Sequence, residues 1–223
     1  MPYYVKGKPG VLSLESKPAT THLFLAEGEA EVGLIEAYLT SIAAPEPATT
    51  ILCFAGVNRI APQSAELAKF ISKSPDKIVG IGLLADADDN PQGRVDVTIN
   101  VAKSFGFKKG GALNTNSVSV EDGRTFAFFI SPGPNQNGRI EDTILGEIGA
   151  SQLFGCVGAA FPCIEEQTGA PVNSKASVQM FISARMNNSM AGILHAFRAA
   201  VFDVQHEAYA GPRTMIDRVM AAG

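Results

Sequence analysis

An apolar run that ends in a cluster of acidic residues constrains this chain more than any other feature. Residues 78–85 carry no charge, and three aspartates follow at once: Asp86, Asp88 and Asp89. A run this apolar is typical of a strand that is buried on both faces, as in a parallel sheet. Open α/β sheets bind their ligands just beyond the carboxyl ends of such strands. The run therefore predicts a parallel sheet with polar chemistry at its edge.

Alternating strand-like and helix-like segments extend this pattern through the first half of the chain. The strands are predicted at 21–27, 50–56 and 77–85, and the helices at 31–42, 64–72 and 94–105. Strand–helix repeats of this kind form right-handed parallel sheets. A hairpin over 116–121 and 125–131 follows, since Asp122-Gly123 is a strong turn dipeptide. Beyond it, helices are predicted at 143–155, 174–185 and 190–202.

We therefore predict one domain over residues 1–223 with an α/β fold. A central, mainly parallel sheet is flanked by helices, with an added hairpin and a helical C-terminal part. The sheet core spans about 21–145 and the helical extension about 146–223, separated loosely by the Pro-, Gly- and Asn-rich segment 132–138. A hydrophobic fraction of 46% is ample for a core of this size.

The net charge of −4 gives no global basic signature. A nucleic-acid partner would have to be held by a local patch or through a bound metal. The best local candidates are Arg59, Arg94, Lys103, Lys108 and Lys109. The oligomeric state stays open.

Cysteine usage and the N-terminus indicate a cytoplasmic protein. The odd number and irregular spacing of Cys53, Cys156 and Cys163 favour reduced, mostly buried thiols over a disulfide framework or a zinc cluster. The N-terminus has no apolar signal core. No window is long and apolar enough to span a bilayer, so no membrane contact is expected.

The acidic cluster after residue 85 has several interpretations. A calcium loop is excluded, because Pro91 stands where that loop needs glycine and Val97 where it needs glutamate. Carboxylates at i and i+2, such as Asp86 and Asp88, can both reach one divalent cation. Helix capping by solvated turn acids and a phosphoacceptor aspartate remain alternatives.

Four short motifs in a fixed order resemble the Toprim fold. They are Ala-Glu-Gly-Glu-Ala-Glu at 26–31, Phe-Ala-Gly-Val-Asn at 54–58, Ala-Asp-Ala-Asp at 85–88 and Gly-Arg-Ile-Glu-Asp at 138–142. More narrowly, the chain looks like small stand-alone Toprim-like proteins of the DUF3226 type, relatives of the nuclease domains of the OLD family. The resemblance covers roughly residues 21–202 and rests on the order and placement of the acids.

The resemblance implies a Mg²⁺-dependent (or Mn²⁺-dependent) phosphodiesterase, most simply a nuclease acting on DNA or RNA. By position it assigns Asp86 and Asp88 to metal binding, Glu27 and Glu141 to metal binding and acid–base catalysis, and Lys175 to the family's late lysine. Glu31 stands where relatives often carry another acid, and Asp142 lies beside Glu141. One alternative is a non-catalytic Toprim-like module that binds a nucleotide or a partner protein. A receiver-like phosphotransfer domain that uses Asp86 is the other.

Overall fold

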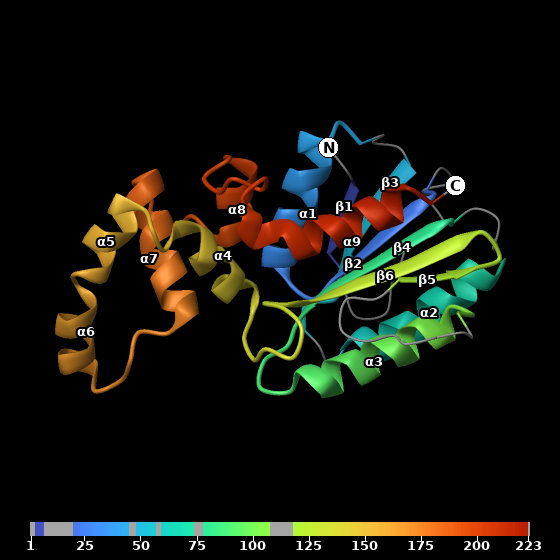
Figure 1. The fold of residues 1–223 in the computed structure, drawn as a ribbon, viewed down its shortest axis with the longest axis horizontal. Helices are drawn as coiled ribbons and strands as arrows, with labels where there is room; N and C mark the ends of the chain where they lie inside the picture. The colour runs from blue at the N-terminus through green and yellow to red at the C-terminus, as the bar shows by residue number, and fades with distance from the viewer. Residues whose placement is uncertain are drawn as a thin grey trace.

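The structure is a computed structural model that describes residues 3–6, 20–44, 48–56, 59–73, 78–107 and 118–222. A strand-and-helix half is followed by a helical half (Figure 1). The strands are β1 (Tyr3–Lys6), β2 (His22–Ala26), β3 (Thr49–Cys53), β4 (Gly80–Asp86), β5 (Val118–Glu121) and β6 (Arg124–Ser131). The helices are α1 (Glu29–Ser41), α2 (Ile60–Lys73), α3 (Pro91–Ser104), α4 (Ile140–Ile148), α5 (Gln152–Gly158), α6 (Phe161–Thr168), α7 (Ser174–Met186), α8 (Ile193–Arg198), a 3-10 helix (Glu207–Tyr209) and α9 (Ala210–Met220).

The sheet has six strands in the order β1-β3-β2-β4-β6-β5. All neighbouring pairs are parallel except β5 with β6, which form the predicted hairpin across Asp122-Gly123. Both turn residues have positive φ, as a two-residue hairpin turn requires. Every residue of β4 is buried except the last, Asp86. The predicted α/β class, the central parallel sheet, the hairpin and the helical C-terminal part are therefore confirmed, and the edge strand β1 is an addition.

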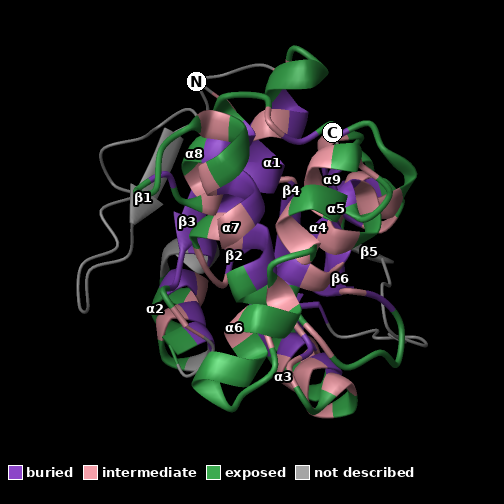
Figure 2. Cartoon of the chain, turned by 90° about the vertical axis from the view of Figure 1, so that its left-hand side faces the viewer, coloured by how far each residue is buried: buried purple, intermediate pink, exposed green. Residues whose placement is uncertain are grey.

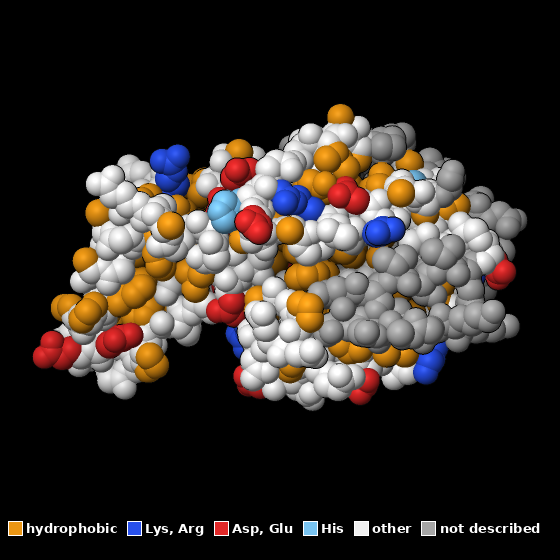
Figure 3. All heavy atoms as spheres, viewed as in Figure 1, with side chains coloured by type: hydrophobic (Ala, Val, Ile, Leu, Met, Phe, Trp, Pro, Cys, Tyr) orange, Lys and Arg blue, Asp and Glu red, His pale blue; other side chains and the backbone are white. Residues whose placement is uncertain are grey.

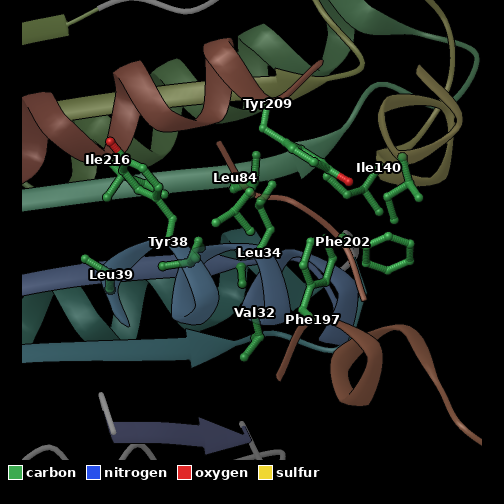
Figure 4. Close-up of a cluster of buried hydrophobic side chains, with 14 of the residues drawn as sticks. Val32, Leu34, Tyr38, Leu39, Leu84, Ile140, Phe197, Phe202, Tyr209 and Ile216 are labelled. Atoms are coloured by element: carbon green, nitrogen blue, oxygen red, sulfur yellow. The ribbon is translucent and has the colours of Figure 1, made fainter. Parts of the chain in front are cut away.

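Side chains alternate between two apolar layers on the two faces of the sheet. On β2, Leu23 and Leu25 join the layer under α2 and α3, whereas Phe24 and Ala26 join the layer under α1, α4, α8 and α9. Figure 4 shows the second layer, where side chains of α1 meet Phe197 and residues of the C-terminal helix. This shared layer joins the helical half to the sheet.

Helix α9 and strand β2 pack so closely on β4 that a side chain at either of two glycines would collide with its neighbours. A Cβ at Gly80 would lie 2.5 Å from the carbonyl oxygen of Val219, and one at Gly82 would lie 2.6 Å from Cδ1 of Phe24 and 2.9 Å from the sulfur of Met215. Real Cβ atoms do not come this close to backbone. The packing of α9 and of side chains from β2 thus explains the glycines in the apolar run.

Several helices differ from their predicted bounds for local reasons. The predicted helix 143–155 is two helices, because the chain turns after Gly149 and Ser151 caps α5 by accepting a hydrogen bond from Phe154 N at 3.1 Å. Helix α3 begins before the predicted residue 94, since Asn90 accepts from Gly93 N at 2.9 Å and caps it. Helix α8 ends at Arg198, shortly before Ala200 adopts a positive φ. Helices α6 and α9 were not predicted.

Helices α5, α6 and α7 (residues 152–186), which we call the arm, project from the rest of the molecule (Figure 1). Much of their surface is exposed (Figure 2). Two of the three cysteines, Cys156 and Cys163, lie exposed on the arm and only Cys53 is buried, so the prediction of mostly buried thiols is wrong. Within the described chain no single helix has the length and apolarity of a membrane span; Ile140–Ile148 and Gln152–Thr168 reach them only together, with a bend of 116°.

Candidate acidic cleft

The ends of two neighbouring parallel strands bring the first acidic side chains together. Glu27 follows β2, and Asp86 is the last residue of β4, which pairs with β2. One carboxylate oxygen of Glu27 accepts a hydrogen bond from the backbone N of Asp86 at 3.2 Å. The Asp86 carboxylate in turn accepts from the backbone N of Ile140, the first residue of α4, at 2.8 Å. The edge predicted from the apolar run thus carries two linked carboxylates.

Two helix N-termini add buried acids to the same edge. Glu31 is 2% exposed and accepts a hydrogen bond from Gly28 N at 2.8 Å, which caps the N-terminus of α1. Glu141, in the first turn of α4, is 7% exposed. No described residue donates a hydrogen bond to the Glu141 carboxylate, which is unusual for a buried charge.

Burial and mutual repulsion hold protons on this cluster. Burial, followed by the charge of Glu31, raises the pKa of Asp86 from 3.8 to about 9, although the hydrogen bond from Ile140 N acts in the opposite direction. Burial, followed by the charges of Glu27 and Glu141, raises the pKa of Glu31 from 4.5 to about 7. Carboxylates that share a site without a cation behave in this way.

The acids line one wall of an open cleft of about 520 Å³, and the arm supplies the opposite wall through Lys175 and Gln179 of α7. Figure 3 shows the surface hollowed between the arm and the rest of the molecule. All five residues assigned by the resemblance line this cleft: Glu27, Asp86, Asp88, Glu141 and Lys175. Their convergence is a finding of the structure, and their roles remain predictions.

Asp88 differs from the other acids because arginines hold both of its oxygens. Oδ1 accepts from Nε of Arg139 at 2.8 Å, and Oδ2 accepts from a terminal nitrogen of Arg94. The backbone of Asp88 has a φ of 49° and exchanges two 2.8 Å hydrogen bonds with Gly138. Asp88 is therefore engaged in ion pairs, whereas Asp86 is crowded by like charges.

The remaining predicted polar residues have local or distant roles. Asp142 caps α4 by accepting from Arg139 N at 2.7 Å, and Asp89 is exposed in a turn. Lys103 lies in the last turn of α3, at the edge opposite the cleft. Arg59 lies near the cleft, since its backbone N donates to the carbonyl of Gly56, which lines the cleft. Arg94 is paired with Asp88 and is not presented to a nucleic-acid backbone. Lys108 and Lys109 lie outside the described residues.

The sequence motifs did not assign Arg139, although it precedes the predicted Ile-Glu-Asp acids directly. Its side chain is 54% exposed and lines the cleft. The sequence could have pointed to Arg139, because a basic residue there stands between the end of a predicted strand and the acidic start of a predicted helix.

The donor set of the cleft fits a hard divalent cation, because every acidic ligand offers carboxylate oxygens. As the described side chains stand, no three His, Cys, Asp or Glu residues are arranged as a complete ligand group. Asp86 and Glu27 each spend one oxygen on a backbone N–H. Binding would therefore require side-chain rotations and the loss of the protons that raised pKa values keep on Asp86 and Glu31.

The fold and the cleft define an α/β protein with an acidic site at the carboxyl edge of a parallel sheet. No family model matches the chain, and no curated protein matches it significantly. Among solved structures it is similar to the hypothetical protein PH0156 from Pyrococcus horikoshii OT3, with a TM-score of 0.53, 11% identity, and coverage of 90% of this chain and 95% of that one. The C-terminal region of the Burkholderia pseudomallei OLD protein gives a TM-score of 0.46 at 13% identity, over 91% and 99% of the two chains. The likeness to the Pyrococcus protein concerns the fold alone, and the second superposition supports no conclusion.

Proposed function

We propose that this protein is a Mg²⁺- or Mn²⁺-dependent phosphodiesterase, with DNA or RNA as the expected class of substrate. One observation carries the proposal: Glu27, Asp86 and the unpartnered, buried Glu141 share one cleft at the carboxyl edge of the sheet. These acids repel one another and would repel a phosphate. A cation between them removes both conflicts.

Each residue has a role that follows from its position. Asp86, Glu27 and Glu141 would hold the cation, because all three line the cleft and the charges of Glu27 and Glu141 both act on Asp86. Glu31, whose charge acts more strongly on Asp86, is the further candidate ligand. A bound divalent cation supplies Lewis acidity toward a phosphate oxygen and offsets charge that develops during an in-line displacement. Glu27 and Glu141 are the candidate acid–base groups. Lys175, on the facing wall, would contact the phosphate.

Metal binding is tested first, by thermal unfolding of the wild type and of Asp86→Asn with increasing Mn²⁺ or Mg²⁺. The wild type should gain stability, since a ligand that binds only the folded state stabilises it. Asp86→Asn should gain much less. The proposal would be refuted if neither ion stabilises the wild type and neither binds it in calorimetry.

Catalysis needs separate evidence. Single- and double-stranded DNA and RNA, incubated with Mn²⁺, should be cleaved by the wild type and not by Glu27→Gln or Glu141→Gln. Gln179→Ala is a matched control, since Gln179 lines the cleft without a charge and donates to Ala191 O at 2.8 Å. Equal cleavage by the wild type and both glutamine variants would show a contaminating nuclease.

A second candidate is a non-catalytic module that binds a nucleotide. The observation that favours it is the absence, within the described residues, of a ready-made group of three metal ligands. In that case Lys175 and Arg139 would bind phosphate without chemistry. Stabilisation by nucleotides in EDTA, without cleavage under any condition, would select this candidate. Incorporation of phosphate at Asp86 would instead select the receiver-like alternative.

A further inference from the structure

The ion pairs of Asp88 separate it from the acids around it. Asp86 lies among the carboxylates of Glu27, Glu31 and Glu141, whereas Asp88 lies between two guanidinium groups. Arg94 and Arg139 carry two positive charges against the single negative charge of Asp88. A cation would have to displace at least one arginine to reach this carboxylate. Asp88 is thus the least available of the cleft's acids for metal binding.

The same contacts hold Arg139 in a defined position at the cleft wall. Its backbone N donates to Asp142 at 2.7 Å, its Nε donates to Asp88 at 2.8 Å, and the preceding Gly138 is bridged to the Asp88 backbone. No described residue accepts a hydrogen bond from the two terminal nitrogens of Arg139. Those nitrogens form the fork that binds phosphate in two parallel hydrogen bonds.

Arg94 has a different environment. Its side chain is 15% exposed, against 54% for Arg139, so it supports Asp88 from the buried side. Asp88, in the connection between β4 and α3, and Arg94 of α3 therefore fix Arg139, in the connection between β6 and α4. In this arrangement the backbone of Asp88 has a left-handed conformation. Such conformations persist where surrounding contacts enforce them and are frequent at functional sites.

We propose that Asp88 is a positioning residue rather than a metal ligand, and that the Arg139 it holds is the phosphate-binding group of the cleft. This inference rests on the proposed function, in which phosphate approaches the acids. It also departs from the metal-binding role that the Ala-Asp-Ala-Asp motif assigns to Asp88. The ligand class is a phosphodiester or another anion that accepts a bidentate pair. Lys175, on the facing wall, would contribute a second positive charge.

Direct Mn²⁺ titration by calorimetry separates the two aspartates. Asp88→Asn should keep the wild-type affinity within about twofold, and Asp86→Asn should weaken it by about tenfold or more, as loss of a ligating charge does. Asparagine tolerates the left-handed conformation at position 88, so the variant should fold. Equal loss of Mn²⁺ affinity in both variants would overturn the inference.

Binding of a fluorescent single-stranded oligonucleotide in Ca²⁺ tests Arg139. Arg139→Gln should weaken binding about five- to tenfold and lower the slope of log affinity against log salt by about 0.7, the value for one phosphate contact on a single strand. Arg185→Gln is the matched control, because Arg185 is an exposed arginine in the last turn of α7 outside the cleft lining. Wild-type binding by Arg139→Gln would overturn the proposal.

A spectroscopic signature distinguishes positioning from general folding. The ¹H–¹⁵N signal of Arg139 Nε, assigned by its loss in Arg139→Gln, should exchange slowly with water in the wild type and rapidly in Asp88→Asn. An unchanged signal in Asp88→Asn would overturn the positioning role. A wild type that binds no Mn²⁺ would refute the proposed function alone, since the oligonucleotide and Nε measurements still decide the role of Arg139.

Discussion

Replacing Asp86 with asparagine should stabilise the protein, because burial and the neighbouring carboxylates make the ionised form of this side chain unfavourable in the folded state. The asparagine side-chain oxygen can still accept the 2.8 Å hydrogen bond from Ile140 N. What disappears is the cost of a carboxyl that burial and the neighbouring carboxylates keep protonated at a pH where the unfolded chain ionises it. A substitution that removes a predicted metal ligand is therefore expected to raise the free energy of unfolding.

The magnitude follows from the pKa. A rise from 3.8 to about 9 corresponds to an upper limit of about 7 kcal/mol above pH 9, at about 1.4 kcal/mol for each pKa step. Asp86 is only partly buried in an open cleft, so water screens it, and we expect about 2 kcal/mol near pH 8. The folded protein holds a proton that the unfolded chain releases, so wild-type stability falls as pH rises from about 4 toward 9. With pKa values of 3.8 and about 9, the advantage of Asp86→Asn should shrink near pH 4.5 to about a fifth of its value at pH 8.

Urea unfolding of both proteins in metal-free buffer, from about pH 4.5 to 8.5, measures this difference. Asp142→Asn is the control: it also neutralises an aspartate at the start of α4, but Asp142 caps the helix through Arg139 N. Its neutralisation should cost a few tenths to about 1 kcal/mol. If Asp86→Asn is no more stable than the wild type near pH 8, or if its advantage does not grow with pH, the account of a repelled carboxylate is refuted.

Three further outcomes follow from the same structure. The apparent Mn²⁺ affinity should rise about tenfold between about pH 6 and pH 8, because the cation displaces protons held by the cluster, and calorimetry in buffers of different ionisation enthalpy should count their release; a flat profile would contradict this. Gly82→Ala should destabilise by about 1–3 kcal/mol in thermal unfolding, since its Cβ would lie 2.6 Å from Cδ1 of Phe24 and 2.9 Å from the sulfur of Met215, whereas Gly155→Ala, with open space at that position in α5, should be neutral or stabilising. Tyr209→Phe should cost about 1–2 kcal/mol in urea unfolding because its hydroxyl donates to Glu147 at 2.6 Å in a buried setting, and an unchanged midpoint would show that this bond contributes nothing.

The parallel core was predictable because its signals are local. The run that forms β4 is apolar throughout and is buried along its length, and Asp122-Gly123 marks the hairpin. The helical half was predicted less well, since its breaks depend on single residues such as Gly149 and Ser151. The approach of α9 to β4 depends on contacts about 135 residues apart, and the two glycines that allow it carry no sign of their partner.

The site divides in the same way. Acids at strand ends were predictable, because the carboxyl ends of parallel strands meet at one edge. The pairing of Asp88 with Arg94 and Arg139 was not, since it joins two connections that are distant in sequence. Spacing alone treats Asp86 and Asp88 as equivalent. Their opposite electrostatic environments arise from residues that the motif does not contain.

The structural roles of the acids help to identify those that need another explanation. Asp142 caps a helix and Asp88 pairs with arginines, so each has a stabilising contact that accounts for its charge. Asp86 and Glu141 do not fit this account, because an asparagine would make the Asp86 hydrogen bond without repulsion and no described residue donates to Glu141. Folding alone would not favour two such carboxylates in one cleft, and residues that break local rules in this way are expected at functional sites. A positively charged ligand bound between these side chains accounts for the presence of both carboxylates.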